Sequence, residues 1–164
     1  MTQADQKSMT ENAVDLMGHE VERRLMRGAE VCGDPAQAAA VHLLVFIELT
    51  GRRVFARHLQ LDAYEGEDGT REPIARVRDW QVLATDEGIS MHPSSRRLLQ
   101  MAASLAAHIP VDLGGIVAVD GHGYIRRIVE AMLIAASGDQ FYTLQGTAAL
   151  EQLVAQTTSP YGLW

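Results

Sequence analysis

The sequence is poor in cysteine, in aromatic residues and in lysine, and each shortage excludes something. A single cysteine, Cys32, excludes an internal disulfide and favours a reducing, cytoplasmic compartment. Aromatic residues make up only 5% of the chain, so leucine, valine, isoleucine, methionine and alanine must fill the core. Lysine occurs once, at Lys7, and the other thirteen of the fourteen basic residues are arginine. We attribute this bias, together with the abundant alanine, to GC-rich bacterial coding.

Motifs for catalysis and for cofactor binding are also missing. The sequence has no Walker loop, no Gly-x-Ser-x-Gly elbow, no His-Glu-x-x-His and no Cys-x-x-Cys, and its six histidines lack metal-ligand spacing. We therefore expect no cofactor, no metal and no catalytic residues, so that an enzyme is disfavoured but stays open. No signal-peptide stretch opens the chain, and its longest apolar run falls short of the about 20 residues that span a membrane.

The remaining composition is that of one globular domain. The 164 residues are 47% hydrophobic and 21% charged, and a chain of this length can bury a core without disulfides or metals. A formal net charge of −7 disfavours nonspecific attraction to nucleic acid or anionic lipid. We expect residues 1–7 to form a loose polar tail and residues 158–164 an apolar one.

The most hydrophobic stretch, from Pro35 to Thr50, predicts a central helix that the rest of the chain encloses. Asp34 is suited to the N-cap, Pro35 to the first helical position, and Gln37 completes an Asp-x-x-Gln capping box. Gly51 is the expected stop. A helix with so few polar positions belongs in the middle of a core.

Other segments show the periodicity of helices and of one β-hairpin. Apolar steps of three and four predict helices from Ser8 to Cys32, from Ser94 to Ile109 and from Asp120 to Ala136, with a short helix from Trp80 to Glu87. Alternation around Asp68-Gly69 predicts strands from His58 to Tyr64 and from Pro73 to Asp79, although residues 52–64 also fit a helix. The expected fold is α+β and mostly helical, with helices packed around the central helix and the hairpin on one side.

Arginines concentrate around the hairpin and suggest a nucleic-acid site. Alternation places Arg76 and Arg78 on one strand face, where two guanidinium groups could hold phosphates while Trp80, of the same parity, stacks on a base. The candidate set is Arg52, Arg53, Arg57, Arg76, Arg78 and Trp80. The acidic residues of the same segment could instead pair with these arginines across a solvated sheet.

Two further places could hold a ligand. His42 lies on the core side of the central helix, where it either finds a partner or lines a pocket. Asp120 and His122 belong to a glycine-containing loop that enters a helix, a place that attracts anions. Four side chains that could bind a metal follow one face of the first predicted helix: Glu11, Asp15, His19 and Glu22. Their helical spacing could bring them to one metal ion. Such rows of acidic residues are usually solvated, however, and we predict no metal site.

The apolar tail favours a protein partner. Tyr161, Leu163 and Trp164 either dock on their own domain or occupy a partner's groove. Our first hypothesis is a small cytoplasmic interaction or regulatory module without catalytic activity, which binds another protein or its own copy. The alternatives are a nucleic-acid-binding accessory protein and a small-ligand binder or enzyme with a pocket near His42 or His122; no membrane role is expected.

Overall fold

The structure, a computed structural model, describes residues 13, 16, 18–117, 122–137, 144, 145 and 147–149. In chain order its elements are α1 (Gly18–Cys32), α2 (Pro35–Phe46), the 3-10 helices η3 (Leu49–Gly51) and η4 (Arg53–His58), β1 (Leu59–Glu65), β2 (Arg71–Val77), α3 (Trp80–Thr85), α4 (Pro93–Ala107), α5 (Leu113–Val117) and α6 (His122–Ala135). The mostly helical α+β fold with one hairpin is therefore confirmed. Within this part of the chain, no helix combines the length and the apolar character needed to cross a bilayer.

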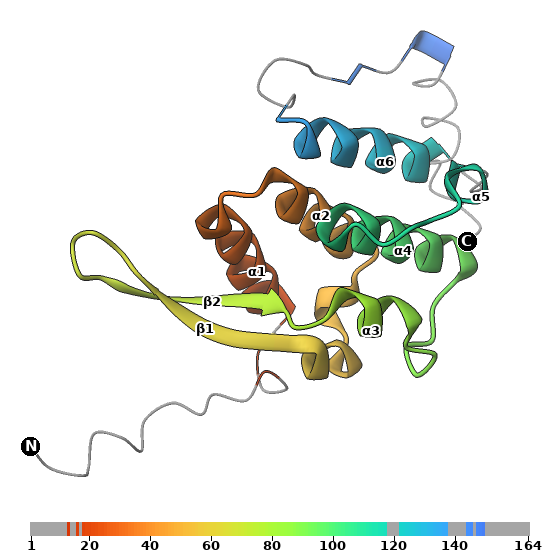
Figure 1. Cartoon of the computed structure of the whole chain (residues 1–164). Coiled ribbons are helices and arrows are strands. Elements are labelled where there is room, and N and C mark those ends of the chain that lie inside the picture. The colour runs from red at the N-terminus through yellow and green to blue at the C-terminus, as the bar shows by residue number, and fades with distance from the viewer. Residues whose placement is uncertain are drawn as a thin grey trace, which may run out of the picture.

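Helix α2 lies at the centre, as its composition predicts. It contacts α1, α4 and α6, while the hairpin packs on α1 through β2 and α3 packs on α4 (Figure 1). Five of its residues are buried: Ala39, Ala40, Val41, Leu43 and Leu44. Helix α6 forms an outer layer over α2 and α4, on the side of the molecule away from the hairpin (Figure 1).

The start of α2 follows the sequence signals, with one change. Gly33 has a φ of +67°, a left-handed value that suits glycine, and the Asp34 carboxylate caps the helix by accepting from the Ala36 N–H at 2.9 Å. Gln37 does not close the capping box. Its Nε2 donates instead to the carbonyl oxygen of Ala106 in α4, at 2.8 Å, so this side chain ties two helices together.

The predicted end of α2 is wrong by about one turn. The helix ends at Phe46 rather than at Thr50, because the backbone becomes left-handed at Glu48, where φ is 55°. The chain then continues as η3, and this change of direction places Leu49 in the core with no exposed surface.

The hairpin pairs β1 with β2 in antiparallel register, from Leu59 opposite Val77 to Glu65 opposite Arg71. The predicted strands were therefore shifted by one residue in β1 and by two in β2. Both interpretations of residues 52–64 were partly right, because η4 precedes β1. At the tip, Gly66 N–H donates to the Thr70 carbonyl oxygen at 2.8 Å, and the exposed residues 67–71 extend away from the helices (Figure 1).

Helix α1 approaches β2 closely through a glycine. A Cβ atom on Gly28 would lie 2.2 Å from the carbonyl oxygen of Ala75, so only glycine fits this contact. The same elements are joined by an ion pair between Arg27 Nε and Glu72 Oε2, at 2.7 Å. The stretch from Ser8 in which the sequence predicts the start of this helix lies mostly outside the described residues.

The later helices begin and end with groups that the sequence did not predict. Helix α4 is capped by His92, whose Nδ1 accepts from the Ser94 N–H at 3.3 Å, and it ends at His108, which is left-handed with a φ of 55°. The short helix α5 precedes α6, and the helix expected from Asp120 begins at His122 in the described residues.

Candidate binding surfaces

The outward side of α6 is apolar, although a surface helix normally turns polar residues to water. Ile125, Val129 and Met132 follow one another at steps of four and three, and they are 43%, 37% and 48% exposed. We call these three residues the α6 face. Ile128 and Ala131 lie about a quarter turn further round the helix and are buried against the core. Helix α6 is thus hydrophobic on two sides, of which only one is covered within the described chain.

An apolar groove adjoins the α6 face. It has a volume of about 460 Å³ and lies where α4, α5 and α6 meet. Its lining consists of Met101, Ser104, Leu105, Val111, Leu113, Met132, Ala135 and Ala136. Met132 belongs to both the face and the groove, and Leu113 on the rim is 51% exposed. Face and groove therefore form one continuous apolar surface.

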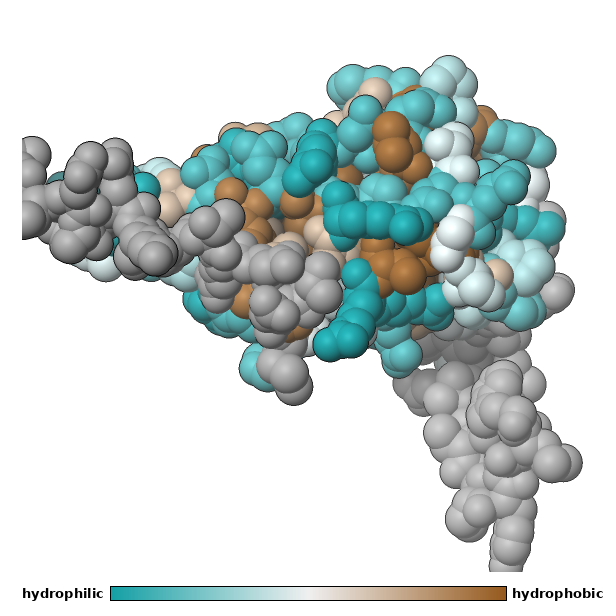
Figure 2. Space-filling view, turned by 90° about the horizontal axis from the view of Figure 1, so that it is seen from below, coloured by the Kyte–Doolittle hydropathy of each residue, from teal (hydrophilic) through white to brown (hydrophobic). Residues whose placement is uncertain are grey.

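Exposed hydrophobic residues elsewhere in the described chain are scattered. Met26, Val54 and Val82 are 50%, 38% and 53% exposed, but they lie on α1, η4 and α3 respectively. On the side that carries the hairpin and α3, hydrophobic residues alternate with hydrophilic ones (Figure 2). Single exposed hydrophobic residues are normal on a protein surface, whereas a contiguous group indicates a contact site.

Glu130 attaches α6 to the centre of the molecule. Its Oε2 lies 3.1 Å from His42 Nε2 of α2 and accepts from Arg127 Nη1 at 2.6 Å, while its Oε1 accepts from Arg126 Nε at 2.8 Å. Burial by itself would raise the pKa of this carboxyl, but the hydrogen bonds and charges of the two arginines and the bond to His42 outweigh it and hold the pKa below its usual value. Glu130 therefore stays ionised where the helices meet.

Aromatic contacts fix α6 at the same junction. The Arg127 guanidinium lies 5.2 Å from the centre of the Phe46 ring of α2, and that ring meets Tyr124 edge to face at 5.4 Å and 84°. His42, a candidate pocket residue, is thus occupied by Glu130 in a helix–helix contact. Of the other pocket candidates, His122 begins α6 and Asp120 lies outside the described residues.

Several of the candidate nucleic-acid residues have partners within the described chain. Arg52 donates to the carbonyl oxygen of Ser90, and Arg78 Nη2 donates to that of Leu59 at 3.2 Å. Arg53 is exposed and, among the described residues, has no hydrogen bond or ion pair. Two of these side chains therefore stabilise the backbone of their own chain.

Arg57 belongs to a polar cluster around Asp86. The Asp86 Oδ2 accepts from Arg57 Nη2 and lies 2.7 Å from His58 Nε2, while its Oδ1 accepts from the Gly88 N–H at 2.8 Å. The hydrogen bonds from Arg57 and His58 lower the pKa of Asp86 to about 2. Arg96 of α4 adds a bond to the Asp86 carbonyl oxygen at 3.0 Å. The cluster holds the loop between α3 and α4 against η4.

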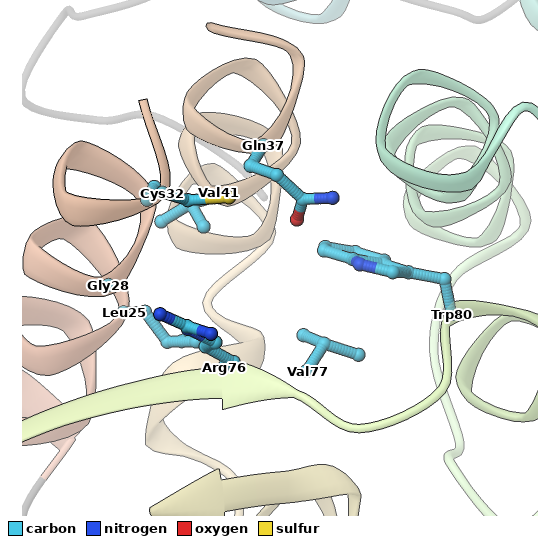
Figure 3. A pocket seen from close by; sticks show the side chains of 9 residues that line it. Leu25, Gly28, Cys32, Gln37, Val41, Arg76, Val77 and Trp80 are labelled. Carbon is cyan, nitrogen blue, oxygen red and sulfur yellow. The ribbon is translucent and has the colours of Figure 1, made fainter. Parts of the chain in front are cut away.

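Arg76 and Trp80, the remaining two candidates, line a cavity of about 200 Å³ between α1, α2, β2 and α3 (Figure 3). Trp80 is only 7% exposed, which leaves little of its ring for stacking on a base from outside. The other lining residues are Leu25, Gly28, Ala29, Cys32, Gln37, Val41 and Val77. Cys32 is a free, exposed thiol.

The possible metal ligands of the first helix and the C-terminal tail residues stay predictions. No group of three or more histidine, cysteine, aspartate or glutamate residues able to hold a metal exists within the described chain. Two members of the line on the first helix, Glu11 and Asp15, lie outside those residues, as do the tail residues Tyr161, Leu163 and Trp164.

The sequence did not predict the contacts made by Glu130 and Asp86, nor the hydrogen bond by which Gln37 joins α2 to α4. The spacing of Arg126 and Glu130, four positions apart on a helix, could have indicated their ion pair. The bond from Glu130 to His42 spans 88 residues, and no local pattern announces such a contact.

The chain matches no protein-family model, no curated protein and no solved structure. Its function is therefore argued from its own surfaces.

Proposed function

We propose that this protein is a small, non-catalytic interaction module of the cytoplasm that pairs with a second copy of itself through the α6 face. The observation that carries the proposal is the exposed apolar series of Ile125, Val129 and Met132, which lies beside the buried face of the same helix. Burial of such a series in a partner removes apolar surface from water, which is the main driving force of association. The single free thiol, Cys32, supports a reducing compartment.

A second copy fits this surface because projecting residues and a groove lie side by side. In a two-fold contact, each surface patch meets its own copy, so that the projecting side chains of one chain cover the groove of the other. Ile125 and Val129 would supply the projection, and the groove at Leu105, Leu113 and Met132 would receive it. One patch then serves both roles.

The charges around the α6 face support burial at its centre. The charged side chains of α6 that are partly exposed, Arg126 and Arg127, both pair with Glu130 of the same helix. Protein interfaces place charged residues at the rim and deplete them at the core. Arg126, with a side chain 58% exposed, is suited to such a rim.

The size of the surface places the expected contact among small interfaces. A helix of 14 residues is about 21 Å long, so that the face and the groove together form a contact at the small end of specific interfaces. We expect a reversible dimer, because burial of a small apolar surface must also offset the freedom lost on association.

Native mass spectrometry and sedimentation equilibrium test the proposal. We expect the natural chain to form dimers and the Val129→Lys variant to dimerise at least about tenfold more weakly, because a charge is then buried in the contact. Val82→Lys is the matched control, because Val82 is an exposed valine on a helix far from α6. It should dimerise like the natural chain.

Two results would overturn the proposal. One is a natural chain that stays monomeric up to the highest concentration at which it is soluble. The other is a dimer that Val129→Lys and Val82→Lys affect equally, since the contact would then lie elsewhere. Circular dichroism of each variant shows whether the helices are retained.

A further inference from the structure

The cavity between α1, α2, β2 and α3 is separate from the α6 face. None of its lining residues belongs to α4, α5 or α6, so a molecule bound there would not compete with a partner on the α6 face. The cavity also differs in chemistry from the apolar groove, because it combines a hydrophobic wall with one cationic side chain.

The hydrophobic wall is made by three helices and a strand. Leu25 and Ala29 of α1 and Val41 of α2 are buried, and Val77 of β2 completes the wall. The indole of Trp80 points into the cavity from the start of α3 (Figure 3). A flat or branched apolar group would contact carbon atoms on several sides here.

The cationic side chain is Arg76, and it has no partner in the described chain. It forms no hydrogen bond or ion pair with another described residue, although most arginines around it do. Figure 3 shows its side chain running from β2 toward α1, beside Leu25 at the edge of the cavity. Among the described residues that line the cavity, none is acidic. In a chain with a net charge of −7, Arg76 therefore provides a local positive charge at the cavity.

The volume limits the ligand to a small molecule. An apolar protein cavity of about 150 Å³ can hold benzene. A cavity of about 200 Å³ therefore has room for a ring of that size with one carboxylate attached. Because the guanidinium presents a planar fork of N–H donors, it matches a carboxylate bidentately.

We propose that this cavity binds a small organic monocarboxylate, with its carboxylate on Arg76 and its apolar body, the size of a benzene ring, between Leu25, Val41 and Trp80. The guanidinium supplies the charge and two donors, and the wall supplies the burial. A neutral molecule of the same shape gains only the burial, and a small anion without an apolar body gains only the charge.

NMR titration with benzoate tests the proposal, with benzamide and acetate as the comparison ligands. We expect saturable shifts of the amides around the cavity with benzoate. Benzamide should bind roughly tenfold to a hundredfold more weakly, which is the usual effect of losing a charge-assisted hydrogen bond. Acetate should also bind more weakly, because it lacks the ring that the cavity wall would bury. The Arg76→Gln variant should lose a similar factor for benzoate. Arg71→Gln is the matched control, because Arg71 is an exposed arginine of the same strand and does not line the cavity.

Alkylation of Cys32 gives an independent readout, since this exposed thiol lines the cavity. Benzoate should slow its reaction with iodoacetamide in the natural chain and in Arg71→Gln, and should not do so in Arg76→Gln. Equal binding of benzoate and benzamide, or equal loss in the two arginine variants, would contradict an anion site at Arg76. Shifts that do not saturate would show that the cavity holds no such ligand. The amide spectra also report whether each variant is folded.

Discussion

Asp86 illustrates how single side chains organise the arginines of this protein. Its carboxylate accepts from Arg57, His58 and the Gly88 N–H, and its carbonyl oxygen accepts from Arg96. A carboxylate with several donors is stabilised in its charged form. Arg57, one of the arginines suggested for phosphate binding, thus helps to hold the loop between α3 and α4 in place.

The lowered pKa of Asp86 predicts a pH-dependent stability. Because its pKa falls to about 2 in the folded chain, the carboxylate adds stability above its unfolded pKa of about 3.9, and this contribution is lost as the pH falls through about 2. We expect Asp86→Asn to lower the free energy of unfolding near neutral pH and to match the natural chain near pH 2. Urea unfolding between about pH 6 and pH 2.5 measures this difference, which should shrink steadily. A difference independent of pH would show that the carboxylate charge does not matter.

Individual polar contacts were the part of the molecule least accessible from the sequence. The Asp34 cap was predictable because its partner lies two residues away. Glu130 and His42 could not be paired, since their contact depends on how α6 lies on α2. Gln37 was expected to close the capping box with Asp34, but it donates instead to the distant Ala106 carbonyl oxygen.

At the scale of elements, the contact of α1 with β2 depends on a glycine. Gly28 allows the helix backbone to approach the Ala75 carbonyl oxygen, and the Arg76 side chain passes beside it, with Cγ 3.6 Å from the position of a Cβ. This contact sets one edge of the cavity. The strand cannot yield easily, because Ala75 is itself paired with Leu61 in β1.

Gly28→Ala is therefore expected to destabilise the protein. A Cβ 2.2 Å from a backbone oxygen forces the elements apart, which costs about 1–3 kcal/mol or more. Gly123→Ala is the matched control, because Gly123 lies in the first turn of α6 with no atom within 4 Å of a Cβ. This change should be neutral or stabilise by up to about 1 kcal/mol. Urea unfolding gives both values, and equal effects of the two variants would contradict the close approach.

Element starts were easier to predict than element ends. The Asp-Pro pair fixed the first residue of α2, because a cap and a proline act within one turn. The end was misplaced because Gly51 marks a stop for sequence reasoning, whereas the left-handed turn at Glu48 is set by the burial of Leu49. For the same reason the hairpin was found but its strands were shifted, since register depends on the turn and on packing.

At the scale of the whole molecule, α6 is an outer layer with a second apolar side. The apolar spacing of this segment predicted a helix but did not say which of its apolar residues are buried. The structure uses Ile128 and Ala131 for the core and leaves Ile125, Val129 and Met132 exposed. Which of the two sides is buried depends on the contacts of α6 with α2, and these lie far away in sequence.

The proposed dimer predicts a thermal stability that depends on protein concentration. If folded chains associate and unfolded chains do not, mass action raises the apparent Tm as the concentration increases. We expect this rise in the natural chain and in Val82→Lys, and its disappearance in Val129→Lys. Differential scanning calorimetry over a wide concentration range measures it. A Tm that is constant in all three proteins would argue against association through α6.

The hairpin tip is a suitable place to attach the protein for binding measurements on the α6 face and on the cavity. Residues 67–71 are exposed and extend away from the helices, and they line neither the cavity nor the groove (Figure 1). Exposed loop tips of this kind tolerate inserted residues well. A short biotinylation sequence placed there would tether the protein to a sensor chip without changing a residue of the α6 face or of the cavity, so that one immobilised sample could report on a second copy and on a carboxylate in successive injections.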